Sequence, residues 1–550
     1  MRLLTFCLVL AAFSATARSE TLLTNVKIVA SPGEPARAGA LAIAGGRIEF
    51  SGPESEARHR WPDAAILDGR GGYAFPGFVD SHGHTWELGE LLEMADLKTA
   101  GSPQECVTRI RAAAARSATG EWIRAYGWNQ NNWAGKAFPD AKILDAEFPS
   151  RPVVAKRIDG HAVWVSSEAM RRAGITKDTR EPEGGKIVRR PDGTPSGVFL
   201  DNAADLLARA EPPPTREEIV RRFRLALAAC AEAGLTGIGD ASGDSPGYDD
   251  TYLPVLRDMA RRGELPIRVY ATVGGRDPKL DSILAAGRVS EGLLTIRAVK
   301  IYADGALGSR GAALLEDYSD DPGNRGFFLT EPSRMESIVE KCFRAGFQPW
   351  IHAIGDRANR AALDAIEKAE AAVHPRDARP RIEHAQVVDE TDRKRFAALG
   401  VIASIQPSFA TSDMSWAGQR LSSRRIGESY AWRSLKTAGA RLCGGSDFPW
   451  ESNRPLLGIY AAIAREDLNG KPTGGWRPGE DLTPAEAVAL YTRDAAFASF
   501  SEATRGRIAP NGDADLTILD RDVTACPPSE IPGSRVLMTV VAGQVVFRAP

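Results

Sequence analysis

Two histidines separated by one residue, His82 and His84, end an apolar segment at residues 76–84. Side chains two positions apart on a β-strand point to the same side, so both imidazoles could coordinate one metal ion. An isolated His-x-His pair also occurs by chance in surface loops. The metal interpretation therefore depends on further ligands elsewhere in the chain.

His352 and His384 provide such ligands, because each ends another apolar, strand-like run. The chain has seven histidines, and four of them therefore occupy strand ends. Neutral imidazole is the usual nitrogen ligand of zinc. One histidine of this kind would more often be a hydrogen-bonded core residue, so it is the set of four that predicts a metal site.

Asp447 ends the last apolar run, within residues 444–449. Its carboxylate could cap the segment that follows, or it could lie beside a metal ion and act as a general base. The residues alone leave both interpretations open.

The elements that must position these side chains are apolar runs of strand length, which alternate with segments of helical periodicity. This alternation predicts a parallel sheet, and about eight repeats predict an α/β fold with a closed (β/α)8 TIM barrel. Barrel enzymes keep their active sites at the C-terminal ends of the strands, where these histidines stand. The expected strands are residues 74–80, 122–126, 235–240, 296–303, 348–352, 381–384, 401–406 and 442–447.

Both ends of the chain carry short alternating strands around glycine turns, which predict one small β-sandwich built from the two ends. A segment at about residues 136–214 has strands of its own, so we expect an insertion near the barrel mouth, with a separate lid domain as the alternative. The expected divisions are residues 18–75 and 506–550 for the β-sandwich and 76–505 for the barrel with its insertion.

Residues 1–17 have the parts of a cleavable signal peptide, with Arg2 at the start, an apolar run at 3–13, and the small residues Ala15 and Ala17. They predict a periplasmic or secreted protein whose mature chain begins near Arg18. No later stretch has the ~20 apolar residues that span a bilayer, so no membrane association is expected after cleavage. Apolar residues are 43%, charged residues 25% and the net charge is -2, which is typical of a soluble globular protein and does not favour nucleic acid.

Taken in order, these motifs resemble the amidohydrolase superfamily, in particular the branch that includes N-substituted formamide deformylases. The resemblance runs over residues 21–547. It implies one or two divalent metal ions, with zinc the expected element. His82 and His84 would bind the more buried ion and His352 and His384 the second. Asp447 would approach the metal and take the proton of the bridging water.

The same resemblance gives roles to Lys300 and His161. Lys300 is similar to the lysine that family members carboxylate so that it bridges two metal ions. An ammonium group cannot ligate a cation, so Lys300 would first lose its proton, from a pKa of ~10.4, and react with carbon dioxide. The alternative is a strand lysine paired with Asp304. His161 would lie near the substrate and polarise a carbonyl or hold an oxyanion, or else have a structural role.

The function implied is hydrolysis of a non-peptide carbon–nitrogen bond, in an amide, formamide or cyclic amide of a small molecule, by a metal-activated hydroxide. An esterase or lactonase on the same metal site is one alternative. An exported binding protein that keeps the barrel without catalysis is another. The substrate and the oligomeric state stay open, a homo-oligomer included.

Overall fold

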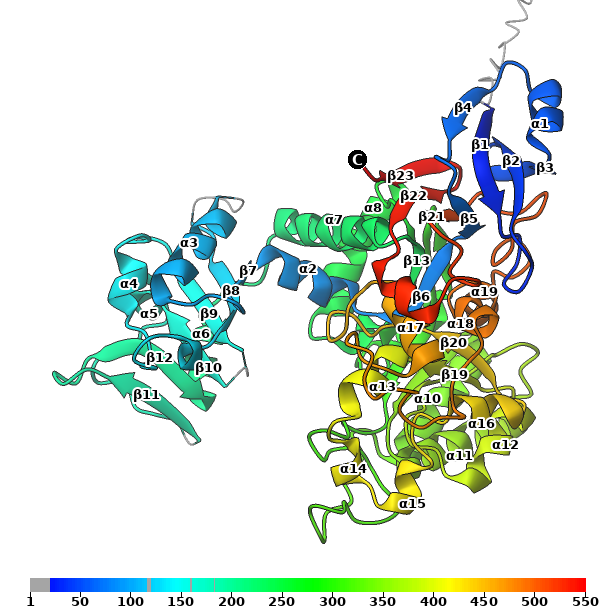
Figure 1. Cartoon of the computed structure of the whole chain (residues 1–550). Coiled ribbons are helices and arrows are strands. Elements are labelled where there is room, and N and C mark those ends of the chain that lie inside the picture. The colour runs from blue at the N-terminus through cyan, green and yellow to red at the C-terminus, as the bar shows by residue number, and fades with distance from the viewer. Residues whose placement is uncertain (1–19, 116–119, 159–160, 183) are drawn as a thin grey trace, which may run out of the picture.

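Eight parallel strands form the barrel. The computed structural model describes residues 20–550 except 116–119, 159–160 and 183 (Figure 1). The signal peptide expected at residues 1–17 lies outside the described residues. The barrel strands follow one another in chain order around the sheet. They are β6 (Phe78–Gly83), β13 (Leu235–Asp240), β14 (Arg268–Gly274), β16 (Leu294–Tyr302), β17 (Gln348–Ala353), β18 (Arg381–His384), β19 (Ile402–Ile405) and β20 (Arg441–Gly444).

The barrel closes where the segment after β20 meets β6. A parallel bridge joins Gly83 to Phe448, and the Asp447 amide donates to the His82 carbonyl at 2.7 Å. A β-carbon at Gly445 would lie 2.6 Å from the His82 nitrogen, so only glycine allows this approach. The predicted (β/α)8 barrel is confirmed.

One expected barrel strand was wrong. Residues 122–126 lie in β8 (Ile123–Trp128), which belongs to a different sheet, and the missing barrel strand is β14. Both segments are short apolar runs, and periodicity does not reveal which neighbour a strand will pair with. Tertiary contacts set the pairing instead. β14 pairs with β13 and β16, whereas β8 pairs with β7 (Ala95–Asp96) and β9 (Val153–Arg157).

The insertion is a unit with its own six-stranded sheet, and it includes β8. The strand order is β11-β12-β10-β9-β8-β7, completed by β10 (Ala162–Val165), β11 (Gly185–Arg189) and β12 (Pro195–Asp201). Trp128 and Trp164 lie in its buried apolar cluster. Figure 1 shows the unit to one side of the barrel, joined to it through α2 (Thr85–Glu93) and α7 (Arg216–Glu232). The sheet starts at Ala95, well before the boundary expected at 136.

Strands from both chain ends form the third sheet, as expected. They are β1 (Thr21–Ile28), β2 (Arg37–Ala44), β3 (Arg47–Gly52), β4 (Ala65–Asp68), β5 (Tyr73–Pro76), β21 (Leu516–Leu519), β22 (Val536–Val541) and β23 (Gln544–Arg548). Antiparallel pairing of β5 with β21 joins the two ends, and both contribute to one apolar cluster. Only Gly77 separates β5 from β6, and a β-carbon there would lie 2.2 Å from the Thr236 hydroxyl oxygen.

Helices between the barrel strands bury one apolar face against the sheet. In α11 (Asp356–Val373) the buried positions Ala358, Ala362 and Ile366 recur at helical spacing. A capping box between Thr215 and Glu218 fixes the start of α7. The other helices of the barrel repeat include α8 (Leu253–Arg261), α10 (Pro332–Ala345), α12 (Glu390–Ala398), α16 (Trp432–Thr437) and α18 (Pro484–Leu490). Within residues 20–550 as described, no helix is long and apolar enough to cross a bilayer.

Candidate metal centre

The C-terminal ends of the barrel strands bring the six predicted metal ligands into one buried region. Five of them line a single cavity of about 330 Å³, and His82 lies buried beside them. The five are His84, Lys300, His352, His384 and Asp447.

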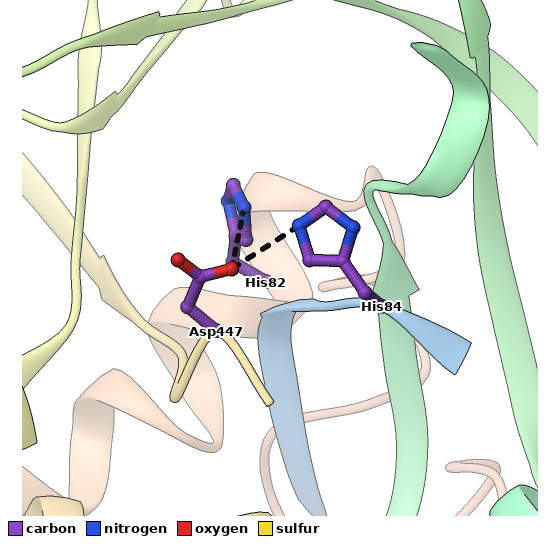
Figure 2. A group of neighbouring side chains, drawn as sticks. All are labelled: His82, His84 and Asp447. Atoms are coloured by element: carbon purple, nitrogen blue, oxygen red, sulfur yellow. Dashed lines mark ion pairs between the residues drawn. The ribbon is translucent and has the colours of Figure 1, made fainter. Parts of the chain in front are cut away.

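His82, His84 and Asp447 form the tightest group (Figure 2). The Asp447 Oδ1 lies 3.5 Å from the His82 Nε2 and 3.1 Å from the His84 Nε2. Asp447 has a left-handed backbone, with φ of 62°, which directs its side chain toward the histidines. The next helix, α17 (Pro455–Ala464), starts after Arg454 without a side-chain cap. The geometry therefore favours a metal-side carboxylate over a helix cap at Asp447.

His352 and His384 extend this group across the cavity. Their ring centroids are 4.5 Å apart, and those of His82 and His384 are 5.2 Å apart. The Lys300 Nζ lies 3.1 Å from the His82 Nε2. Asp304 instead accepts backbone hydrogen bonds from Ile354, Gly355 and Ala313. Among the described residues Lys300 forms no ion pair, so the alternative pairing with Asp304 is not observed.

Glu383, next to His384 in β18, orients His82. Its Oε2 lies 2.5 Å from the His82 Nδ1, so a proton on Nδ1 leaves the Nε2 lone pair facing Asp447. Arg381 donates two hydrogen bonds to Glu383, at 2.7 and 2.9 Å, and stacks on Trp350 at 3.5 Å. Sequence reasoning missed both residues. The available signal was a charged pair inside an otherwise buried strand.

His384 is oriented in a similar way by Gln406, whose Oε1 lies 2.7 Å from its Nδ1. Burial lowers the pKa of His384 and lowers the pKa values of His82 and His352 well below their usual range. These imidazoles are therefore neutral at neutral pH, as metal ligands must be. Burial also lowers the pKa of Lys300, in the direction that carboxylation requires.

The donor set fits a divalent cation. Two buried polar atoms, the His84 Nδ1 and the His352 Nε2, have no hydrogen-bond partner in the described part of the chain. Burial would raise the pKa of Asp447, but its contact with the His84 Nε2 helps to hold that pKa below its usual value, so the carboxylate is ionised. Neutral imidazoles with a carboxylate are nitrogen and oxygen ligands, which suit zinc and similar ions.

His161 lies elsewhere, in the inserted unit just before β10. Its side chain is 74% exposed, and its Nδ1 lies 2.9 Å from the Asp201 Oδ1. It is not among the residues that line the cavity. The structure therefore does not bring His161 to the metal ligands, and its role toward the substrate stays a prediction.

We expect Glu383→Gln to weaken binding of a divalent metal, with zinc as the probe ion, by about 10- to 100-fold, because an outer-shell carboxylate that fixes a ligand imidazole commonly contributes this much. The measurement is the zinc dissociation constant by chelator competition. The exposed Glu217→Gln, on α7, is the matched control. The thermal midpoint must also be recorded, because removing one partner of the buried pair with Arg381 destabilises the fold. An unchanged zinc constant in a folded variant would contradict the orienting role.

A closed parallel barrel with imidazole, lysine and carboxylate side chains at its strand ends has the architecture of a metal-dependent hydrolase. The chain belongs to the amidohydrolase family, whose family model matches residues 65–547. The resemblance predicted from the motifs is confirmed.

Individual relatives agree with this assignment. "Putative amidohydrolase YtcJ" from Bacillus subtilis (strain 168) is 33% identical over 516 residues, which cover 93% of this chain and 96% of the relative. N-substituted formamide deformylase from Arthrobacter pascens is 27% identical over 549 residues, covering 96% and 98%. An uncharacterized metal-dependent hydrolase from Pyrococcus horikoshii OT3 matches with a TM-score of 0.76 and 29% identity, covering 93% and 99%. The protein is thus a hydrolase of this family, which implies a divalent metal.

Proposed function

We propose that the protein hydrolyses a non-peptide carbon–nitrogen bond, in an amide, formamide or cyclic amide of a small molecule. The observation that carries the proposal is the convergence of His82, His84 and Asp447 beside an open cavity. A bound metal ion would lower the pKa of a water molecule toward ~7 and polarise the scissile carbonyl. Zinc is the metal we propose.

In this proposal the four histidines hold the metal, and Asp447 moves the proton. Its carboxylate accepts the proton of the attacking water and delivers it to the leaving nitrogen, which departs as a neutral amine. Lys300, carboxylated, would add two oxygen ligands and allow a second ion. Its short distance to the His82 Nε2, 3.1 Å, supports a role inside the ligand set.

The similarity to N-substituted formamide deformylase supports a carbon–nitrogen bond as the target. Ester or lactone hydrolysis is the rival within the same chemistry, since it needs the same hydroxide and a different leaving group. A non-catalytic binding protein is the rival from another class. The complete set of ligands argues against it, because a barrel without catalysis has no need to keep them.

The test compares metal-free protein with the same protein reloaded with zinc, on a panel of N-substituted formamides, amides, cyclic amides and matched esters and lactones. We expect zinc to restore hydrolysis of at least one carbon–nitrogen substrate and chelation to abolish it. Asp447→Asn, purified in parallel, controls for contaminating hydrolases. Full activity without metal, or cleavage confined to esters and lactones, would overturn the proposal.

A further inference from the structure

One wall of the cavity carries a carboxylate with no counter-ion. Asp413, the last residue of α13 (Pro407–Asp413), lines the same cavity as the metal ligands but does not belong to their group. Its Oδ2 accepts a hydrogen bond from the Tyr430 hydroxyl at 2.6 Å. Its Oδ1 accepts none from the described residues, and Asp413 forms no ion pair with any of them. One oxygen is thus held in place while the other is free for a ligand.

Gln386 supports the contact between Tyr430 and Asp413. Its Nε2 donates to the Tyr430 hydroxyl oxygen at 2.5 Å and lies 3.5 Å from the Asp413 Oδ2. Tyr430 and Gln386 are both buried, so the carboxylate is fixed by side chains that cannot easily move. Such support is what a ligand-binding group requires, and solvent-exposed carboxylates lack it.

A second carboxylate, Glu451, adds negative charge beside Asp413. It is half-buried, and it also forms no ion pair in the described structure. Burial, followed by the effect of nearby Glu451, leaves the pKa of Asp413 raised to about 6. Burial also raises the pKa of Glu451, with Asp447 contributing. At neutral pH Asp413 is therefore mainly ionised, and no arginine or lysine among the described residues pairs with it.

Aromatic rings line the same cavity. Phe409, Trp416 and Trp450 line the cavity together with Asp413. The ring faces of aromatic side chains attract cations, and a carboxylate beside such rings favours a cation over a neutral or anionic group. Arg420 lies 5.8 Å from the Trp416 ring, but it is paired with Asp320 and not with Asp413. The cavity therefore offers aromatic rings and a carboxylate to a positively charged ligand.

We infer that the cavity selects substrates that carry a protonated amine away from the scissile bond, held by Asp413 beside the aromatic rings of Phe409 and Trp416. This inference rests on the proposed function, since it assigns the substrate class of the same site. Asp413 is a specificity-determining residue in this arrangement and takes no part in proton transfer.

The experiment uses zinc-loaded protein and two matched formamides. One is the N-formyl derivative of 4-(aminomethyl)benzylamine, which is cationic, and the other is N-formyl-4-ethylbenzylamine, which is neutral. A second matched pair consists of amides whose acyl group carries the protonated amine in one member and an ethyl group in the other. We expect wild-type kcat/KM to be at least about tenfold higher for the cationic member of one pair, as a hydrogen bond to a charged group typically gives. A preference for the neutral members of both pairs would overturn the inference.

Asp413→Asn keeps the shape and removes the charge. We expect it to lower the cationic-to-neutral ratio of kcat/KM by about 10- to 100-fold, through KM rather than kcat. Asp63→Asn, at an exposed position in the turn before β4, is the matched control and should keep the ratio. If Asp413→Asn does not fold, Glu451→Gln should lower the same ratio. A ratio unchanged in a folded Asp413→Asn would also overturn the inference.

A calorimetric measurement separates this inference from the proposed function. If zinc-loaded wild type hydrolyses none of the formamides or amides, the proposed function fails. Binding of 4-(aminomethyl)benzylamine then tests the cation site directly. We expect at least about tenfold weaker binding in Asp413→Asn than in wild type. Equal affinity in the two proteins would overturn the inference, whatever the activity assay gives.

Discussion

Asp447→Asn should lower kcat by about 10²- to 10⁴-fold while the protein keeps most of its metal. In the proposed site the histidines and a carboxylated Lys300 would still hold the ion, and the substitution would remove the group proposed to accept and return the proton. Asparagine has nearly the same shape and tolerates the left-handed backbone seen at position 447, with its φ of 62°. The measurements are kcat on the best substrate and metal content by elemental analysis.

The exposed Asp63→Asn serves again as control for this experiment, because it changes the same atoms far from the strand ends. Near-normal kcat in Asp447→Asn would show that the carboxylate does not transfer the proton. Complete loss of metal would show instead that Asp447 acts mainly as a ligand, and the general base would then have to be sought elsewhere.

Lys300→Ala should lose at least one metal ion per chain. Its activity should fall by more than about 100-fold, since loss of a residue that only orients a ligand typically costs about 10- to 100-fold. A carbamate on Lys300 would supply two oxygens, so its removal would leave a gap in the ligand set. Added acetate or formate should partly restore both metal content and rate by occupying that gap. Metal stoichiometry and kcat, each with and without acetate, are the quantities to measure.

Lys156→Ala, at an exposed position in β9, is the matched control for Lys300→Ala. Full metal occupancy in Lys300→Ala would exclude the bridging role, and the site would then consist of the four histidines and Asp447. Loss of stability without loss of metal would indicate a lysine that only fills space in the barrel.

The barrel was predictable because its strands end in residues that carry chemistry. His82, His352, His384 and Asp447 mark four strand ends directly, and the glycine at 445 lets the last of them meet the first. β14 has no such marker, and its run Arg268–Gly274 resembles many other buried strands. β8 was predicted as a barrel strand instead, because the alternation of side chains indicates which residues are buried and not which strand they pair with.

The candidate metal ligands could be named from residue type and order, whereas the residues that orient them could not. Glu383 reaches His82 across 301 positions of sequence, and Gln406 reaches His384 across 22. Contacts of this kind depend on strand register, which a single sequence does not define. The same applies to Asp413 and Tyr430, whose significance comes only from the cavity that they share with the metal ligands.

The pairing of β5 with β21 has a consequence for synthesis of the chain. In this pairing Phe75 lies opposite Thr517, 442 positions further along the chain, so β5 has no β21 partner until nearly the whole chain has been made. At ribosomal rates of about 5–20 residues per second, this delay is roughly 20–90 s. During that time β5 presents an unpaired edge, which is a template for wrong association between nascent chains. This risk at the edge of β5 therefore applies to the growing polypeptide, and it ends when β21 pairs with β5.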